Sequence, residues 1–292
     1  MESCPPMALP SLTGLSLDRL NSFLQVAEAR GLARAAPGDP VRQSQLSRQL
    51  KELENALGQV LFDRSSRGFE LTGAGHVLAR VVRELGQGIS DVTAAAKGPV
   101  KVSLGAGDSV LQWLVLPKLG ELHKALEGVE LAVGAQGSDG VVAGLLEHRI
   151  DLGLLRSSET LGDLKQVKLG QVSYAIFSAV GQGRLPLAVP TTERGLARAT
   201  RSLGPVALGC ESFPQVEQAV RSGSFRGVLP TFVRGLLPAS QFKMTSVPEL
   251  DAVSTPLVLA WRPRTLELRP QVKALRHALE PVIRRTLARF AL

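Results

Sequence analysis

The sequence predicts an α/β fold preceded by an N-terminal domain that is rich in α-helix. Three observations support this prediction. Apolar residues in the first 97 positions recur at helical spacing, a heptad series follows from Leu78 to Val92, and short apolar runs alternate with helical segments beyond Pro99. A chain of 292 residues is long enough to form two domains, and we take two domains as the working assumption.

The composition favours a cytoplasmic protein. Cys4 and Cys210 cannot form a disulfide framework, and Cys4 lies in a proline-rich leader, residues 1–14, that we expect to be disordered. The sequence shows neither a signal-peptide pattern nor an apolar run of about 18 residues, so we expect no membrane association. The net charge of +8 suits a polyanionic partner, but much of the excess lies in residues 262–292, so the total does not locate a binding site.

Three helices are expected after the leader. The stripe of the first helix, in residues 17–28, consists of Leu17, Leu20, Phe23, Leu24 and Ala27. A short second helix, residues 31–36, ends at the turn Pro37-Gly38-Asp39-Pro40, which no helix crosses. The third helix spans residues 42–54, with Ser44 as its expected N-cap.

The third helix has two different faces. Its leucines recur at steps of four, three and four and form one buried face: Leu46, Leu50, Leu53 and Leu57. The opposite face carries Gln43, Gln45, Ser47, Arg48 and Lys51. Amide and guanidinium groups can pair with base edges in a major groove, and hydroxyls and cations can hold phosphates. A solvated surface helix has the same polar face, so the neighbouring elements must decide between the two interpretations.

The next segment predicts a wing. Two short apolar runs between Val60 and Thr72 flank a polar tip, whose Arg64 and Arg67 could hold phosphates or enter a minor groove. The alternative is an ordinary polar turn. Residues 15–74 together predict a winged helix-turn-helix domain that binds DNA. Its candidate DNA-binding residues are Arg34, Arg42, Gln43, Ser44, Gln45, Ser47, Arg48, Lys51, Arg64 and Arg67.

Several blocks in this domain carry a family resemblance. They are Phe23-Leu-Gln-Val-Ala-Glu, Ala33-Arg-Ala-Ala, the run from Gln43 to Glu54, Leu57-Gly, Leu61-Phe-Asp-Arg and Leu71-Thr-Gly-Ala-Gly. In this order and register the chain resembles the LysR-type transcriptional regulators. The resemblance implies that Gln43, Ser47 and Arg48 contact DNA and that wing arginines contact its backbone.

The chain departs from the family pattern at the entrance to the third helix. Gly31 replaces the usual cap of the second helix, and Asp39 stands where an apolar residue is common. Arg42 and Ser44 replace a frequent Ser and Pro, so Arg42 is expected to add a phosphate contact or change the base preference. The DNA sequence that a relative binds therefore does not predict the DNA sequence that this protein binds.

A long helix, residues 75–98, links the two domains. The residues of its heptad seam are Leu78, Val82, Leu85, Ile89 and Val92. Such a seam favours pairing with a second chain, and burial against its own domain is the alternative. The family resemblance also assigns dimerisation to this helix. Gly86 and Gly88 would each weaken it by about 1 kcal/mol relative to Ala.

Residues 99–292 predict an α/β domain with largely parallel sheets. Small ligands bind such sheets at the carboxyl ends of strands, beside helix N-termini. Polar or small residues follow four predicted strands there, and the candidate ligand-binding residues are Asp108, Ser109, Gly137, Ser138, Thr191, Thr192, Ser212 and Phe213. Ordinary N-capping of the following helices would explain the same residues.

This region also resembles the LysR-type effector domain. The segments Ile150-Asp-Leu-Gly-Leu-Leu155 and Gly227-Val-Leu-Pro230 carry this weaker match. The resemblance implies two subdomains like those of a periplasmic binding protein, crossed by two strands, with a small-molecule effector in the cleft. We place subdomain I at about residues 99–172 and 262–292, and subdomain II at about 173–261. The family also implies a homodimer and a tetramer built as a dimer of dimers.

Catalysis is not indicated. Gly105-Ala-Gly107 lacks the third glycine of a dinucleotide fingerprint, the four histidines have no metal-ligand spacing, and no nucleophile elbow occurs in the sequence. We therefore expect no cofactor and no metal. Cys210 is a core residue in this interpretation, and thiol sensing is the alternative. The sequence predicts a DNA-binding regulator with an unknown effector; a ligand-independent regulator, or an α/β enzyme with a DNA-binding head, are the competing hypotheses.

Overall fold

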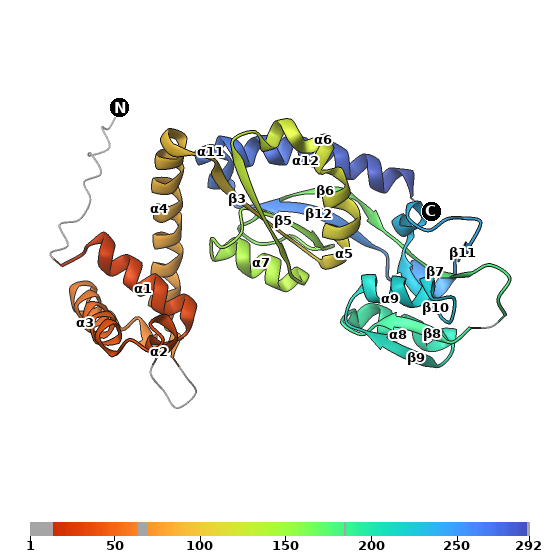
Figure 1. Cartoon of the computed structure of the whole chain (residues 1–292), viewed down its shortest axis with the longest axis horizontal. Coiled ribbons are helices and arrows are strands. Elements are labelled where there is room, and N and C mark those ends of the chain that lie inside the picture. The colour runs from red at the N-terminus through yellow and green to blue at the C-terminus, as the bar shows by residue number, and fades with distance from the viewer. Residues whose placement is uncertain (1–13, 64–68, 184, 291–292) are drawn as a thin grey trace. The chain divides into compact units, whose positions relative to one another are not determined.

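The computed structural model describes residues 14–63, 69–183 and 185–290 (Figure 1). The chain divides into two compact units, the first ending at Ser90 and the second beginning at Asp91. The helix that contains this division, α4, spans Gly73–Lys97. Each unit is described on its own below.

The first unit has the predicted order of elements: helix, short helix, turn, helix and two short strands. The elements before α4 are α1 (Leu17–Ala29), α2 (Leu32–Ala35), α3 (Pro40–Leu57), β1 (Phe62–Asp63) and β2 (Glu70–Leu71). The strands β1 and β2 pair antiparallel, as in a wing. The segment between them, including Arg64 and Arg67, lies outside the described residues.

The predicted leucine face of α3 forms the centre of the first core. Leu46, Leu50 and Leu53 are fully buried, and Leu57 packs against them while partly exposed. Phe23 of α1 contacts Phe62 of β1, with ring centroids 5.4 Å apart. Apolar burial therefore fixes α3 so that its polar face is directed away from the core.

The start of α3 corrects one prediction. Ser44 is not its N-cap, because the helix begins at Pro40 and Asp39 caps it, accepting a 2.9 Å hydrogen bond at Oδ1 from the Arg42 amide. Proline favours the first position of a helix, where its missing amide hydrogen costs nothing. Gly38, with φ of 73°, supplies the left-handed residue that turns the chain into the helix. Ser44 therefore lies inside α3 and is exposed.

The second unit contains two five-stranded sheets. The first sheet has the order β4-β3-β5-β12-β6 and the second has the order β11-β7-β10-β8-β9. The strands are β3 (Val100–Ala106), β4 (Val129–Ala135), β5 (Leu152–Arg156), β6 (Lys165–Val172), β7 (Tyr174–Ala179), β8 (Leu187–Pro190), β9 (Val206–Cys210), β10 (Arg226–Pro230), β11 (Phe242–Thr245) and β12 (Thr255–Trp261). The α-helices are α5 (Asp108–Val110), α6 (Leu119–Leu122), α7 (Ser138–Leu146), α8 (Arg194–Ala199), α9 (Phe213–Arg221), α10 (Pro248–Asp251), α11 (Pro263–Leu268) and α12 (Pro270–Arg289).

Two predictions about these sheets are wrong. The sheets are mixed: β3, β4 and β5 run parallel, as do β8, β9 and β10, but β12 pairs antiparallel with β5 and β6, and β7 pairs antiparallel with β10 and β11. In addition, β12 belongs to the first sheet, so residues 255–261 were wrongly assigned to subdomain II. The cause is long-range pairing, since β12 inserts between two strands that precede it by about a hundred residues.

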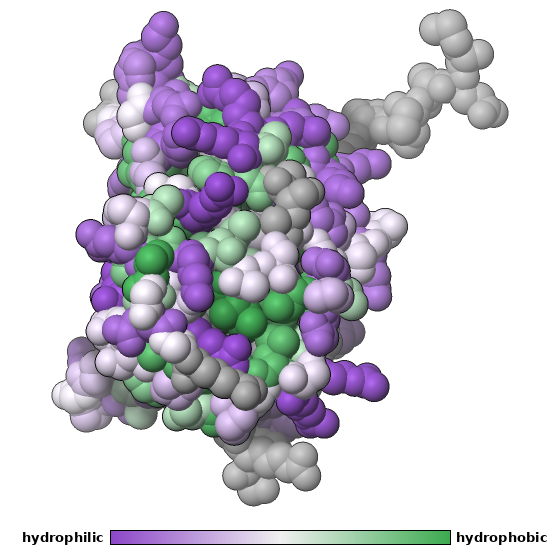
Figure 2. All heavy atoms as spheres, turned by 90° about the vertical axis from the view of Figure 1, so that its right-hand side faces the viewer, coloured by the Kyte–Doolittle hydropathy of each residue, from purple (hydrophilic) through white to green (hydrophobic). Residues whose placement is uncertain are grey.

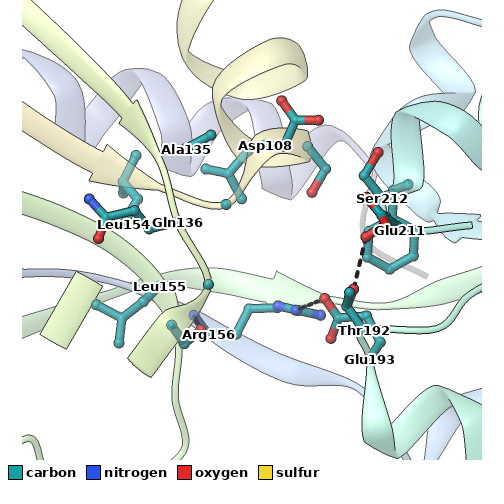
Figure 3. Close-up of a pocket in the computed structure, with 16 residues that line it drawn as sticks. Asp108, Ala135, Gln136, Leu154, Leu155, Arg156, Thr192, Glu193, Glu211 and Ser212 are labelled. Atoms are coloured by element: carbon teal, nitrogen blue, oxygen red, sulfur yellow. Dashed lines mark hydrogen bonds and ion pairs between the residues drawn. The ribbon is translucent and has the colours of Figure 1, made fainter. Parts of the chain in front are cut away.

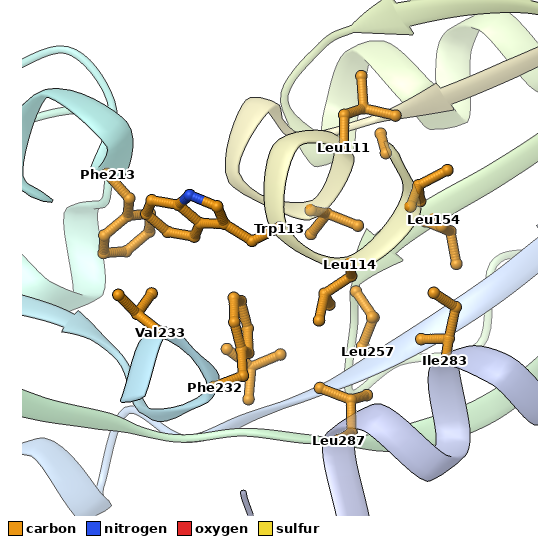
Figure 4. Packing of buried hydrophobic residues seen from close by; sticks show 14 of the residues in the cluster. Leu111, Trp113, Leu114, Leu154, Phe213, Phe232, Val233, Leu257, Ile283 and Leu287 are labelled. Atoms are coloured by element: carbon orange, nitrogen blue, oxygen red, sulfur yellow. The ribbon is translucent and has the colours of Figure 1, made fainter. Parts of the chain in front are cut away.

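The chain crosses between the sheets twice, first from β6 to β7 and later from α10 to β12. At the crossing, the Ser173 and Ser254 hydroxyls lie 3.1 Å apart, and Ser254 donates a 3.2 Å hydrogen bond to the Val172 carbonyl. One hydrophobic core extends across both sheets, and it includes Trp113 beside Phe232 with centroids 6.1 Å apart (Figure 4). The crossing strands and this core hold the two sheets of the second unit together.

Helices cover both faces of the first sheet. Leu257 and Leu259 of β12 share the core with α12, whereas the alternate residues Val258 and Ala260 pack with α7. On the side where β7 and β11 lie, Figure 2 shows hydrophobic residues exposed between hydrophilic ones.

No helix among the described residues combines the length and the apolar character needed to cross a bilayer.

Candidate functional site

The polar face of α3 is the first candidate site. Ser44, Gln45, Arg48 and Lys51 are exposed, and Ser47 is half-buried beside them. None of these five side chains has a hydrogen bond or ion pair with another described residue. A row of free amide, hydroxyl and cationic groups on one rigid helix can pair with base edges and phosphates.

Other predicted DNA-binding residues are engaged within the unit. Gln43 donates from Nε2 to the Ala36 carbonyl at 2.8 Å, and Arg42 donates from Nη2 to Gln25 Oε1 at 3.3 Å. Arg34 donates to the Arg30 carbonyl. Gln43 and Arg42 therefore brace α3 against the end of α2 and against α1, so their side chains help to set the angle between these helices.

One exposed residue at the entrance of α3, Val41, was not predicted from the sequence. Val41 is 71% exposed, although it is apolar and lies next to Arg42. An exposed valine beside polar residues offers a methyl surface of the kind that contacts thymine methyl groups. Its position on the predicted helix was not visible because we expected the helix to begin later.

The seam of α4 is divided between two environments. Val82 is only 7% exposed and Leu78 packs against the same core, so both serve the first unit itself. By contrast, Leu85 and Ile89 are each 44% exposed and Val92 is 76% exposed. Val77 and Val81 add further exposed apolar surface to this helix. The alternative prediction, that the seam is buried against its own domain, is therefore correct only for Leu78 and Val82.

The second candidate site is a cavity of about 320 Å³ in the second unit. Seven of the eight predicted ligand-binding residues line it: Asp108, Ser109, Gly137, Ser138, Thr192, Ser212 and Phe213. They come from loops at the carboxyl ends of strands in both sheets, as the strand-end rule requires. The volume is within the range of small-molecule sites.

Thr191 is not among the lining residues. Its hydroxyl donates to the Cys210 carbonyl at 2.9 Å and its amide donates to the same oxygen at 2.7 Å, which extends the pairing of β8 with β9. N-capping does not account for the hydroxyls that do line the cavity. Ser212 is in the N-cap position of α9 but makes no capping hydrogen bond with its side chain, and Ser138 Oγ instead accepts a 3.3 Å hydrogen bond from the Arg156 amide.

The cavity also contains an ion pair that was not predicted from the sequence. Arg156, at the end of β5, extends towards Glu193 beside α8, and the two groups form a salt bridge (Figure 3). Arg156 also donates to the Tyr174 hydroxyl. Arg156 and Glu193 are only 25% and 26% exposed. Both lie next to predicted strand ends, so the rule that selected the hydroxyls also covers them, but their pairing joins opposite sheets.

Burial affects the charges at this pair. Burial by itself lowers the pKa of the Arg156 guanidinium, but Tyr174 and Glu193 outweigh it, and the pKa is raised above its ordinary value. Burial raises the pKa of the Tyr174 hydroxyl. Arg156 therefore stays charged and Tyr174 stays neutral around neutral pH.

Cys210 and metal ligands are the remaining chemical candidates. Cys210 is 7% exposed at the end of β9, and burial raises the pKa of its thiol. A buried, protonated thiol fits a core residue better than a thiol sensor. Within the described parts of the chain, no group of three or more His, Cys, Asp or Glu side chains is arranged to hold a metal ion.

The chain contains a winged helix-turn-helix unit, a long helix and a unit of two sheets with a ligand-sized cavity. These parts define the class of helix-turn-helix proteins with an attached binding domain. Comparison with protein families agrees with this class. Residues 17–76 match the lysR family of bacterial regulatory helix-turn-helix proteins, and residues 100–284 match the LysR substrate binding domain. The chain therefore belongs to the LysR family.

Individual relatives are more distant. The transcriptional regulator HdfR of Yersinia enterocolitica is 28% identical over 169 residues, which cover 57% of this chain and 58% of HdfR. The chain thus spans about half the length of the curated relatives it matches.

Two solved structures share the fold. Full-length CbnR in complex with its target DNA is 22% identical with a TM-score of 0.56, covering 90% of this chain and 100% of CbnR. LysG of Corynebacterium glutamicum with the bound effector Arg is 20% identical with a TM-score of 0.61, covering 91% and 98%.

Proposed function

We propose that the protein is a transcriptional regulator that binds double-stranded DNA in a sequence-specific manner and is modulated by a small molecule. The observation that carries this proposal is the unpartnered polar face of α3 on a winged helix-turn-helix unit of the LysR family. CbnR, whose structure was solved in complex with its target DNA, supports the same role for this chain.

The α3 helix reads bases in the major groove. Gln45 and Arg48 provide amide and guanidinium groups for base edges, while Ser44, Ser47 and Lys51 hold phosphates. Arg42 and Gln43 act mainly by orienting the helix, since their side chains are hydrogen-bonded within the unit. Arg64 and Arg67 remain candidates for the DNA backbone.

The protein acts as a homodimer, and as a tetramer built from two dimers. The exposed apolar residues on α4, Leu85, Ile89 and Val92, pack against a second copy. Dimerisation places two α3 helices in successive major grooves of a pseudo-palindromic site. A regulator of this kind works in the cytoplasm.

The effector binds in the cavity between the two sheets of the second unit. Its lining comes from both sheets, so a ligand there favours one arrangement of the sheets over another. LysG, whose structure holds the bound effector Arg, supports an effector role for this domain. The ligand shifts DNA binding only to the extent that it prefers one arrangement.

One observation favours a second candidate, a ligand-independent regulator. The salt bridge between Arg156 and Glu193 fills part of the cavity with the protein's own side chains. In that case the second unit would serve assembly, and no small molecule would change DNA binding.

The experiment that tests the proposal is gel retardation of duplex DNA from near the protein's own gene. The double variant Ser47→Ala, Arg48→Ala should lose specific retardation while its circular dichroism spectrum stays unchanged. Arg80→Ala, which removes an exposed cation of α4 in the same unit, is the matched control and should bind normally. Equal specificity of the double variant and the control would remove α3 from base reading.

A further inference from the structure

The ligand cavity is acidic in a basic protein. Three carboxylates, Asp108, Glu193 and Glu211, and one guanidinium, Arg156, line it and give a net formal charge of −2. The whole chain carries +8. The cavity itself is identified by its volume and by the LysR substrate-binding domain that contains it; the charges bear only on the kind of ligand.

Arg156, the cation among the lining residues, already has hydrogen-bond partners inside the protein. Arg156 donates to both Glu193 and the Tyr174 hydroxyl. An anionic ligand could reach Arg156 only by displacing Glu193, and it would then face a third uncompensated carboxylate. The loss of an existing pair and the added repulsion both oppose an anion.

The other two carboxylates have no cationic partner among the described residues. Asp108 is half-buried and accepts a 3.1 Å hydrogen bond only from the neutral amide of Gln112. Glu211 is exposed, so solvent screens it more strongly. Both carboxylates can accept hydrogen bonds from a ligand ammonium or guanidinium group without breaking a contact inside the protein.

Three helix N-termini oppose this negative charge. The first residues of α5, α7 and α9 line the cavity, and none of these helices has a side-chain cap. Each N-terminus is equivalent to roughly half a positive charge. Their sum is therefore about three quarters of the net formal charge of the lining and leaves the cavity weakly negative. A carboxylate is tolerated at these ends if the same molecule also carries a cation.

We infer that the effector of this protein is a small organic cation, a molecule whose ammonium or guanidinium group contacts Asp108, Glu193 and Glu211. This inference rests on the proposed function, in which the cavity is the effector site. It excludes dicarboxylates and other simple anions as effectors.

The test is calorimetric titration of the full-length protein with four probes of similar length: 1,5-diaminopentane, lysine, norleucine and adipate. Lysine differs from norleucine by its terminal ammonium group, so this pair isolates the cation. Lysine and diaminopentane should bind, norleucine should bind at least about fivefold more weakly than lysine, and adipate should not bind. Adipate binding as tightly as lysine, or the absence of amine binding at millimolar concentration, would overturn the inference.

Variants locate the binding. Asp108→Asn and Glu211→Gln should each lower the lysine affinity by about fivefold, because each removes one ionic contact and keeps the shape. Glu249→Gln, an exposed substitution outside the cavity lining, should leave it unchanged. Equal affinity in all three variants would contradict the assignment. If the protein retards DNA specifically but binds adipate as tightly as lysine, the proposed function stands and this inference fails. If the protein binds amines but no DNA, the cavity takes organic cations and the proposed function fails.

Discussion

At the scale of single residues, Gly75 shows how closely the first unit is packed. A Cβ atom added at Gly75 would lie 2.2 Å from the Leu61 carbonyl oxygen and 2.9 Å from Leu71 Cδ2. The contact is with backbone, which cannot move aside as a side chain can. Thr72 fixes the same turn, since its Oγ1 accepts from the Gly75 amide at 3.1 Å.

Gly75→Ala should therefore destabilise the first unit, by about 2 kcal/mol or more. Gly73→Ala is the matched control, because a Cβ there meets nothing within 4 Å. Urea unfolding followed by circular dichroism compares the two. A Gly75→Ala protein as stable as the control would show that α4 and the Leu61 carbonyl do not approach each other this closely.

Arg269 is the second residue with a large expected effect. It is 6% exposed, and it binds Asp91 Oδ2 and Asp151 Oδ1, each at 2.5 Å, and the Lys101 carbonyl at 2.6 Å. Asp151 also accepts from the amide and hydroxyl of Ser103, each at 2.8 Å. One guanidinium thus joins the end of α4 to β3 and to the start of β5.

Arg269→Ala should cost about 3 kcal/mol, since it removes the closest cation from the buried Asp151 and from the partly buried Asp91. Arg284→Ala removes an arginine that is 45% exposed and paired with Glu280, and it should cost less than about 1 kcal/mol. Thermal unfolding of both variants measures the difference. Similar melting temperatures would mean that the Arg269 network contributes little.

At the scale of elements, α4 combines two roles that the heptad pattern alone could not separate. Leu78 and Val82 complete the first core, whereas Leu85 and Ile89 remain exposed at the same periodicity. A single repeat predicts one apolar stripe, but the first unit is only long enough to cover its beginning.

The double variant Leu85→Ser, Ile89→Ser should lower the mass observed by sedimentation velocity and keep the first unit folded. Val82→Ser should instead lower stability, by about 1 to 3 kcal/mol, because it removes buried methyl groups. Arg80→Ser is the surface control. An unchanged mass for the double variant would exclude this part of α4 from the interface.

Local patterns predicted the helices α1, α2, α3 and α4 but misplaced one boundary. The start of α3 was placed too late because Asp39 and Pro40 were interpreted only as a turn, although an acidic cap followed by proline also begins a helix. The edge strands β6 and β11 carry exposed polar residues, which dilute the apolar signal that predicts a strand. Edge position is a property of the fold that the sequence does not display.

At the scale of the whole molecule, the sequence predicted most of the polar residues that line the cavity but did not predict its ion pair. Strand ends followed by small polar residues identified seven lining residues, because parallel strands bring such ends to one edge. The salt bridge of Arg156 with Glu193 joins two sheets whose relative placement no local pattern reveals. The same limit explains the wrong assignment of β12, which returns to the first sheet after the second is complete.

The central claim is that α3 reads DNA sequence as one half of a paired device. Selection of bound sequences from a random duplex pool, with the full-length protein, tests it most directly. The account predicts one enriched pseudo-palindromic motif with half-sites about one helical turn apart, and a different or lost motif for Ser47→Ala, Arg48→Ala. No enriched motif, or the same motif from the variant, would contradict it.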